Sequence, residues 1–115
     1  VRDMIEMALP VSGSSDRPVT EGNPWTGIWS AVARTTKGGK PIAPEQCVHV
    51  EHALKMWTIN GARANYTEEF TGTITPGKFA DLIWIDRNPL DCETDQLRSI
   101  TVSKTFIDGK QVYSA

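Results

Sequence analysis

The sequence predicts an α/β chain made of two unlike halves, with one short strand and several helices in residues 1–66 and mainly strands in residues 67–115. The first half carries apolar residues at helical spacing, which indicates amphipathic helices. The second half carries short apolar runs and alternating segments between turn dipeptides, which indicates strands. One strand cannot form a sheet by itself, so the first half is expected to be an incomplete structure.

The first strand leads directly to a carboxylate. We expect residues 1–7 to be the end of a helix and residues 8–12 to be a buried strand, followed by small residues and then Asp16. Pro18 stops the strand from continuing. A β/α barrel places catalytic and metal-binding carboxylates at the C-terminal ends of its strands. The same residues are also typical of a turn in which Asp16 bonds to the local backbone, and both interpretations stand here.

Two helical regions are expected next. Four apolar residues at i, i+3, i+4 and i+7 predict a helix over residues 24–33, and we expect the apolar stripe that they form to face the core. A loop is expected over residues 36–41. A second helix is expected to begin near Pro44, and a short helix over residues 58–65 follows, with a break around Asn60 and Gly61. The apolar positions of these helices are Trp25, Ile28, Trp29, Val32, Val50, Ala53, Leu54 and Trp57.

The second half is expected to form three or four strands. Asp108-Gly109 is a strong hairpin signal, and Pro76-Gly77 marks an earlier turn. Such a set amounts to half of a sandwich with exposed edges. The expected strands cover residues 72–74, 80–85, 100–107 and 111–113, with at most one helical turn at 94–98.

Composition excludes several functional classes. The chain has 115 residues, of which 39% are apolar and 23% charged, as in a folded globular domain. A net charge of −2 gives no sign of the basic surface that binds nucleic acid or an anionic membrane. No apolar run approaches the roughly 20 residues that span a bilayer. We expect a cytoplasmic protein in which Cys47 and Cys92 are reduced, although two cysteines could form one disulfide.

Four segments, taken in order, resemble the C-terminal end of the metal-dependent amidohydrolase superfamily, and most closely the branch called amidohydrolase family 3, which includes proteins like N-substituted formamide deformylase. The resemblance covers nearly the whole chain, and the combined order is more specific than any one piece. The segments are residues 13–19, similar to the end of barrel strand eight; 23–34, similar to the helix that follows; 53–62, similar to the late helices; and 72–90, similar to the closing strands, with Gly109 in the final turn.

The resemblance implies a fold and a chemistry. Residues 1–66 would be the end of a (β/α)₈ hydrolase barrel, and residues 67–115 would be C-terminal strands of a composite β-sandwich. The implied reaction is metal-assisted hydrolysis of a non-peptide C–N bond in a small amide, with a divalent cation, commonly zinc. Asp16 matches the strand-eight aspartate, which is implied to contact the metal and to act catalytically as the proton acceptor and donor.

The other ligands that the resemblance implies would come from earlier barrel strands, which this chain lacks. His49 and His52 share a helical face and could in principle chelate a metal, although exposed or packing histidines are expected. A zinc site needs three or four protein ligands. We therefore expect the isolated chain to bind no cofactor and to be inactive. We expect it to form a homo-oligomer or to associate with the missing N-terminal part, because its apolar faces and strand edges are open.

Other candidate residues are expected to have structural roles. The loop from Lys37 to Lys40 could contact an anion but is expected to be solvated, and Ser14 and Ser15 lack the partners of a nucleophile. Asp81 and Asp86 are expected to serve turns and strand register, as the resemblance implies. Two other functional classes stay open: a non-catalytic interaction module or barrel remnant that assembles with a partner chain, and a free-standing α+β domain.

Overall fold

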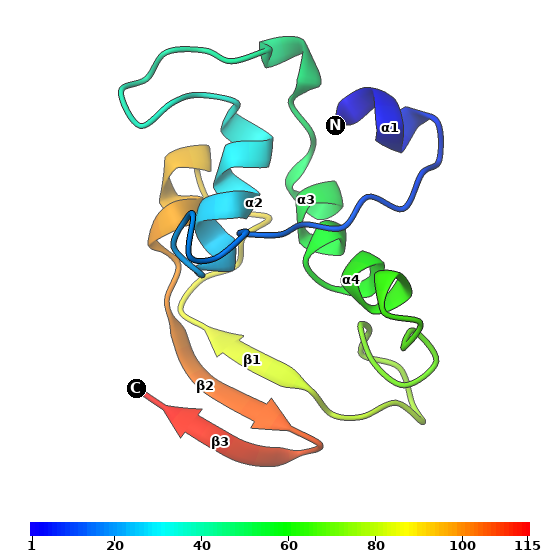
Figure 1. Cartoon of the computed structure of the whole chain (residues 1–115). Helices are drawn as coiled ribbons and strands as arrows, with labels where there is room; N and C mark the ends of the chain where they lie inside the picture. The colour runs from blue at the N-terminus through cyan, green and yellow to red at the C-terminus, as the bar shows by residue number, and fades with distance from the viewer.

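A computed structural model describes residues 1–115, with helices in the first half of the chain and a small sheet in the second (Figure 1). None of its helices has both the length and the apolar character that crossing a membrane would require. The helices are α1 (Arg2–Glu6), α2 (Pro24–Ala33), α3 (Val50–Met56) and α4 (Ile59–Ala64), with 3₁₀ turns η1 (Pro44–Gln46) and η2 (Thr94–Ser99), and the strands are β1 (Leu82–Ile85), β2 (Val102–Ile107) and β3 (Lys110–Ser114).

Helix α2 forms as the sequence predicts. Asn23 caps it, because its side-chain oxygen accepts a hydrogen bond from the Trp25 N–H at 3.0 Å. The helix ends at Arg34, whose backbone is left-handed with φ +48°. The predicted stripe is buried except for its last member, Val32, which is half-buried.

The hydrophobic core lies where α2, α3 and η2 meet. Leu97 of η2 is 1% exposed and packs with the buried tryptophans of α2. The Trp29 indole N–H donates to an Asp95 carboxylate oxygen at 3.2 Å, and the Arg98 guanidinium lies over the Trp29 ring at 4.8 Å. The core therefore takes side chains from both halves of the chain: Trp25, Ile28, Trp29, Ala31, Val48, Ala53, Leu97 and Ile100.

The sheet lies below the helices in Figure 1 and has the antiparallel order β1-β2-β3. The β2–β3 connection is the predicted two-residue hairpin, with Ile107 paired to Lys110. Both turn residues have positive φ, +48° at Asp108 and +73° at Gly109, as a type I′ turn requires. The chain thus contains three strands, and residues 72–74 do not form the additional one that the sequence predicts.

The prediction of a buried strand over residues 8–12 is wrong. These residues form no strand, and Leu9 is 46% exposed. The segment runs extended across α3 toward α2 (Figure 1) without a neighbouring strand to pair with. An extended segment gains ladder hydrogen bonds only from such a neighbour, and residues 11–13 bond instead to α4 and to the end of α3.

Two helix boundaries also differ from the prediction. Pro44 starts only the three-residue turn η1, and α3 begins separately at Val50 with His49 as its N-cap. The break after α3 falls at Thr58, whose φ −125° and ψ −102° are not helical, whereas Asn60 and Gly61 lie inside α4. From within α4, the Asn60 side-chain amide donates a hydrogen bond to the Val11 carbonyl.

Candidate functional site

Asp16 lies on an exposed turn at the end of the extended segment. The Val19 N–H donates to the Asp16 carbonyl at 2.9 Å, and the Asp16 N–H donates to the Ser14 hydroxyl at 3.2 Å. Asp16 has φ +50°, a left-handed conformation that Asp adopts more readily than most residues. The backbone therefore forms a turn, but the Asp16 carboxylate accepts no hydrogen bond within the chain and is open to a ligand or to solvent.

The backbone before Asp16 is held by the α3–α4 junction. The Gly13 N–H donates to the Met56 carbonyl, and the Asn60 side-chain amide donates to the Val11 carbonyl, each at 2.9 Å. Between these two bonds, the Trp57 ring lies directly against the Cα of Gly13. Three contacts thus fix the path of residues 11–13, and the carboxylate follows three residues later.

A pocket of about 240 Å³ lies next to this turn, lined by residues of the 14–21 segment, by α2 and by Trp57, but not by Asp16 itself. Several of its lining residues carry hydroxyl groups, of which two are engaged within the chain: Thr20 donates to the Ser15 carbonyl, and Ser14 accepts from the Asp16 N–H. The sequence analysis missed this pocket, although the density of Ser and Thr around Asp16 was a usable signal: the hydroxyls come from Ser14, Ser15, Thr20, Thr26 and Ser30.

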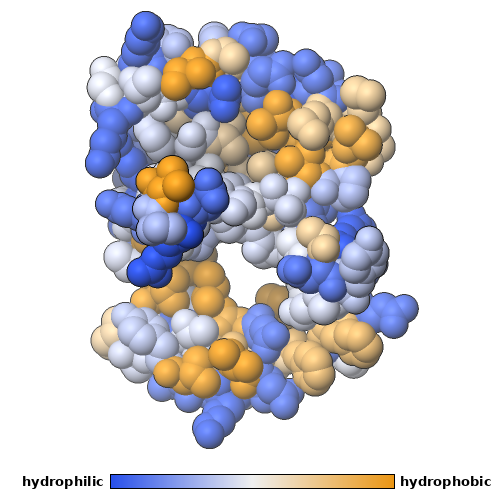
Figure 2. Space-filling view, viewed as in Figure 1, coloured by the Kyte–Doolittle hydropathy of each residue, from blue (hydrophilic) through white to orange (hydrophobic).

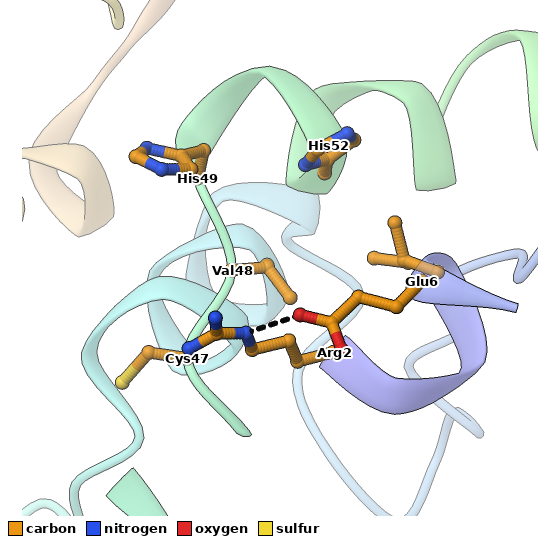
Figure 3. A pocket seen from close by; sticks show the side chains of 7 residues that line it. Arg2, Glu6, Cys47, Val48, His49 and His52 are labelled. Atoms are coloured by element: carbon orange, nitrogen blue, oxygen red, sulfur yellow. Dashed lines mark hydrogen bonds and ion pairs between the residues drawn. The ribbon is translucent and has the colours of Figure 1, made fainter. Parts of the chain in front are cut away.

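His49 and His52 lie at a different place. They lie at the start of α3 and line a pocket of about 360 Å³ beside α1, and the His49 ring points away from His52 (Figure 3). An Arg2–Glu6 ion pair of 2.7 Å closes the other side, and Glu6 raises the pKa of Arg2 by accepting its hydrogen bond. Asp16 is not among the residues that line this pocket, and no cluster of potential metal ligands joins it to the histidines, so His49, His52 and Asp16 do not form one site.

The residues present do not fit a metal ion on their own. No group of three or more His, Cys, Asp or Glu side chains lies close enough together to hold one. Zinc in proteins takes three or four ligands, and Asp16 supplies one carboxylate. The cysteines add nothing, because Cys47 and Cys92 are free, half-buried and in separate parts of the fold.

The remaining candidates have structural contacts or none. Asp81 accepts the Asp108 N–H at 2.9 Å and so ties β1 to the hairpin turn. Asp86 accepts the Thr101 N–H at 3.0 Å, a bond that lowers the pKa of its carboxyl group. The loop from Lys37 to Lys40 is exposed. These positions serve turns and strand ends, as expected for the two aspartates.

Much apolar surface stays exposed, including the orange region over the sheet in the lower part of Figure 2. The chain exposes 7958 Å² in total, whereas a compact monomer of this mass exposes about 6,200 Å². Both edges of the sheet are unpaired. Large side chains about half-exposed on its strands are Ile83, Trp84, Ile107, Val112 and Tyr113.

Comparison with known proteins gives a consistent result. The pattern described as "Amidohydrolase family" matches residues 1–113. N-substituted formamide deformylase of Arthrobacter pascens is 41% identical over 109 residues, which is 95% of this chain and 20% of that protein. YtcJ of Bacillus subtilis (strain 168) is 30% identical over 115 residues, 97% of this chain and 22% of that protein.

The fold is shared with a solved amidohydrolase from Thermotoga maritima MSB8, with a TM-score of 0.74 at 23% identity. The likeness covers 98% of this chain and 25% of the Thermotoga chain. The fold of residues 1–115 therefore fits a segment of a larger hydrolase. The chain spans about a fifth of the length of the curated relatives it matches.

Proposed function

This chain belongs to the amidohydrolase family, and on that premise we propose that it is the C-terminal portion of a metal-dependent enzyme that hydrolyses non-peptide C–N bonds in small amides. The observation that carries the proposal is the presentation of Asp16. Its carboxylate is exposed and unbonded, while the backbone before it is fixed by hydrogen bonds from two sides. A group that must contact substrate is held in this way, with a rigid support and a free functional end.

We assign Asp16 as the catalytic carboxylate of the complete enzyme. A carboxylate can accept a proton from attacking water at one oxygen and return it to the leaving nitrogen. A pocket lined partly by Ser and Thr residues lies next to the same turn. Because no neighbouring charge or hydrogen bond in this chain occupies the Asp16 carboxylate, its partners would come from outside residues 1–115.

The arrangement of the halves supports a placement within that enzyme. Residues 1–66 would form the end of a (β/α)₈ barrel, with residues 8–12 completing strand eight only when neighbouring barrel strands pair with them. Residues 67–115 would belong to a composite β-sandwich, and the three-stranded sheet with two open edges suits such a place. The core around Leu97 would join the two parts.

The proposed cofactor is a divalent metal, with zinc as the first candidate, bound mainly by residues of the rest of the enzyme. We propose that this chain would contribute Asp16, and one carboxylate does not make a site, since no group of three or more potential ligands lies together here. The isolated chain is accordingly proposed to be inactive. Its exposed apolar surface would be covered by the rest of the enzyme, or, without it, by a second copy of the chain.

Complementation tests this proposal. The deformylase of Arthrobacter pascens, shortened by the segment that matches this chain, would be mixed or co-expressed with residues 1–115, and hydrolysis of an N-substituted formamide would be measured. We expect activity with the native chain and none with Asp16→Asn, which keeps size and shape but cannot hold the proton. Binding without activity for both chains would instead favour an interaction module, and activity with Asp16→Asn would overturn the assignment of Asp16.

A further inference from the structure

We propose that Trp57 is the positioning residue for Asp16: its ring occupies a slot between two glycines and so locks the backbone that carries the carboxylate. The role of Asp16 in catalysis rests on the proposed function, but the locking itself does not. Trp57 is the C-cap of α3 and follows Met56, whose carbonyl already bonds to Gly13. The Trp57 indole therefore adds a side-chain contact next to the backbone hydrogen bond between Gly13 and Met56.

The slot lies between Gly13 and Gly27, where any side chain larger than hydrogen would overlap the Trp57 ring. A methyl group at Gly13 would overlap the Trp57 ring atoms Cε3, Cζ3 and Cδ2, and a methyl group at Gly27 would overlap Cζ2 and Cη2. Both overlaps lie far inside van der Waals contact. The benzene part of the indole is thus enclosed by the extended segment on one side and by α2 on the other, and only glycine fits at either position.

The break between α3 and α4 supports the same assignment. Thr58 leaves the helical conformation, and two residues later Asn60 bonds to the Val11 carbonyl with its side-chain amide. Residues 56, 57 and 60, on both sides of the break, therefore contact residues 11–13 through a backbone bond, a ring and a side-chain bond in turn.

Trp57 also lines the pocket beside the turn together with Ser14 and Ser15, the two residues that precede Asp16. Trp57 is half-buried and packs at the edge of the core. Its contacts are distributed between the core and the segment that presents Asp16.

The test uses local readouts in the 115-residue chain, which do not depend on activity. Trp57→Leu and Trp57→Phe would be compared with native protein by amide hydrogen exchange at position 13 and by the ¹⁵N relaxation of residues 14–16. For Trp57→Leu we expect exchange at position 13 to accelerate at least about tenfold beyond any change in the α2 interior, with increased mobility at Asp16. Trp57→Phe, which keeps an aromatic ring, should restore part of the protection.

A double variant separates positioning from folding. Gly13→Ala should mobilise residues 14–16 in the native background and should have little added effect in Trp57→Leu, where the ring that it would strike is absent. Gly61→Ala is the matched control, because an added methyl group there meets only ordinary contacts. If exchange and relaxation near Asp16 change only in parallel with α2, or if Gly13→Ala is equally disruptive in both backgrounds, the proposal is overturned, whether or not Asp16 is catalytic.

Discussion

Replacing Leu97 with Ala would test whether one core joins the two halves of this chain. Leu97 belongs to η2 in the second half, but its side chain is 1% exposed and packs among residues of α2 and α3. Leu90 lies nearby in sequence and is 50% exposed, so Leu90→Ala makes the same chemical change without the burial. The difference in unfolding free energy between Leu97→Ala and Leu90→Ala measures how much the packing of η2 against the helices stabilises the fold.

The expected loss follows from the burial of one leucine. Leu→Ala removes three carbons, worth about 0.8 kcal/mol each on transfer from water, or roughly 2.4 kcal/mol. A cavity term adds to this, and buried Leu→Ala changes cost about 2.7–5 kcal/mol in total. We expect about 3 kcal/mol for Leu97→Ala and less than about 0.5 kcal/mol for Leu90→Ala. Only ten residues of the chain are buried, so the larger loss is a substantial part of its stability.

Urea unfolding followed by tryptophan fluorescence and by far-ultraviolet circular dichroism would measure both variants. In a Trp84→Phe background, which removes the tryptophan of β1, the remaining tryptophans report on the helical layer, and the sheet contributes to the dichroism. We expect coincident transitions by both probes, shifted to lower urea for Leu97→Ala. A loss below about 1 kcal/mol, or a fluorescence transition that stays at the native position, would refute the shared core.

Three other predictions can be checked on the same chain. The hydrogen bond from Thr101 lowers the pKa of Asp86 below its ordinary value of 3.8, so the ionised carboxylate stabilises the fold above that pH, and this contribution is lost as the pH falls through the folded pKa. A ¹³C titration of the carboxyl group should therefore give a midpoint below 3.8. In Asp86→Asn the free energy of unfolding should decrease less steeply as the solution is acidified. Gly27→Ala should lower stability by about 1–3 kcal/mol through overlap with Trp57, whereas Gly61→Ala, also in a helix, should be neutral or stabilising, as measured by thermal unfolding. Light scattering on the isolated chain should give a mass above that of one copy, since the excess exposed surface favours association, and a monomer at high concentration would contradict this.

Local patterns predicted the elements that depend on neighbours in sequence. The α2 stripe and the Asp108-Gly109 hairpin formed as expected, because helical spacing and the need for positive φ act within a few residues. The family resemblance, seen in segments spread over the chain, is confirmed by the match over residues 1–113. These features do not require any particular tertiary partner.

Elements that depend on distant partners were predicted less well. An apolar run such as residues 8–12 is a strand only where another strand lies beside it, and this chain supplies none there. The helix boundary at Thr58 likewise lies beside contacts with residues 11–13, which local helix propensity does not encode.

At the candidate site, the carboxylate of Asp16 and the turn residues around it could be identified from the residues alone. What supports that carboxylate depends on contacts between distant segments: the Trp57 ring between Gly13 and Gly27, the bond from Asn60, and the pocket beside the turn. The tertiary structure also separates His49 and His52 from Asp16. The physical reason is that a side chain's ionisation and reach belong to the residue, whereas close packing and cavities exist only between segments that the fold brings together.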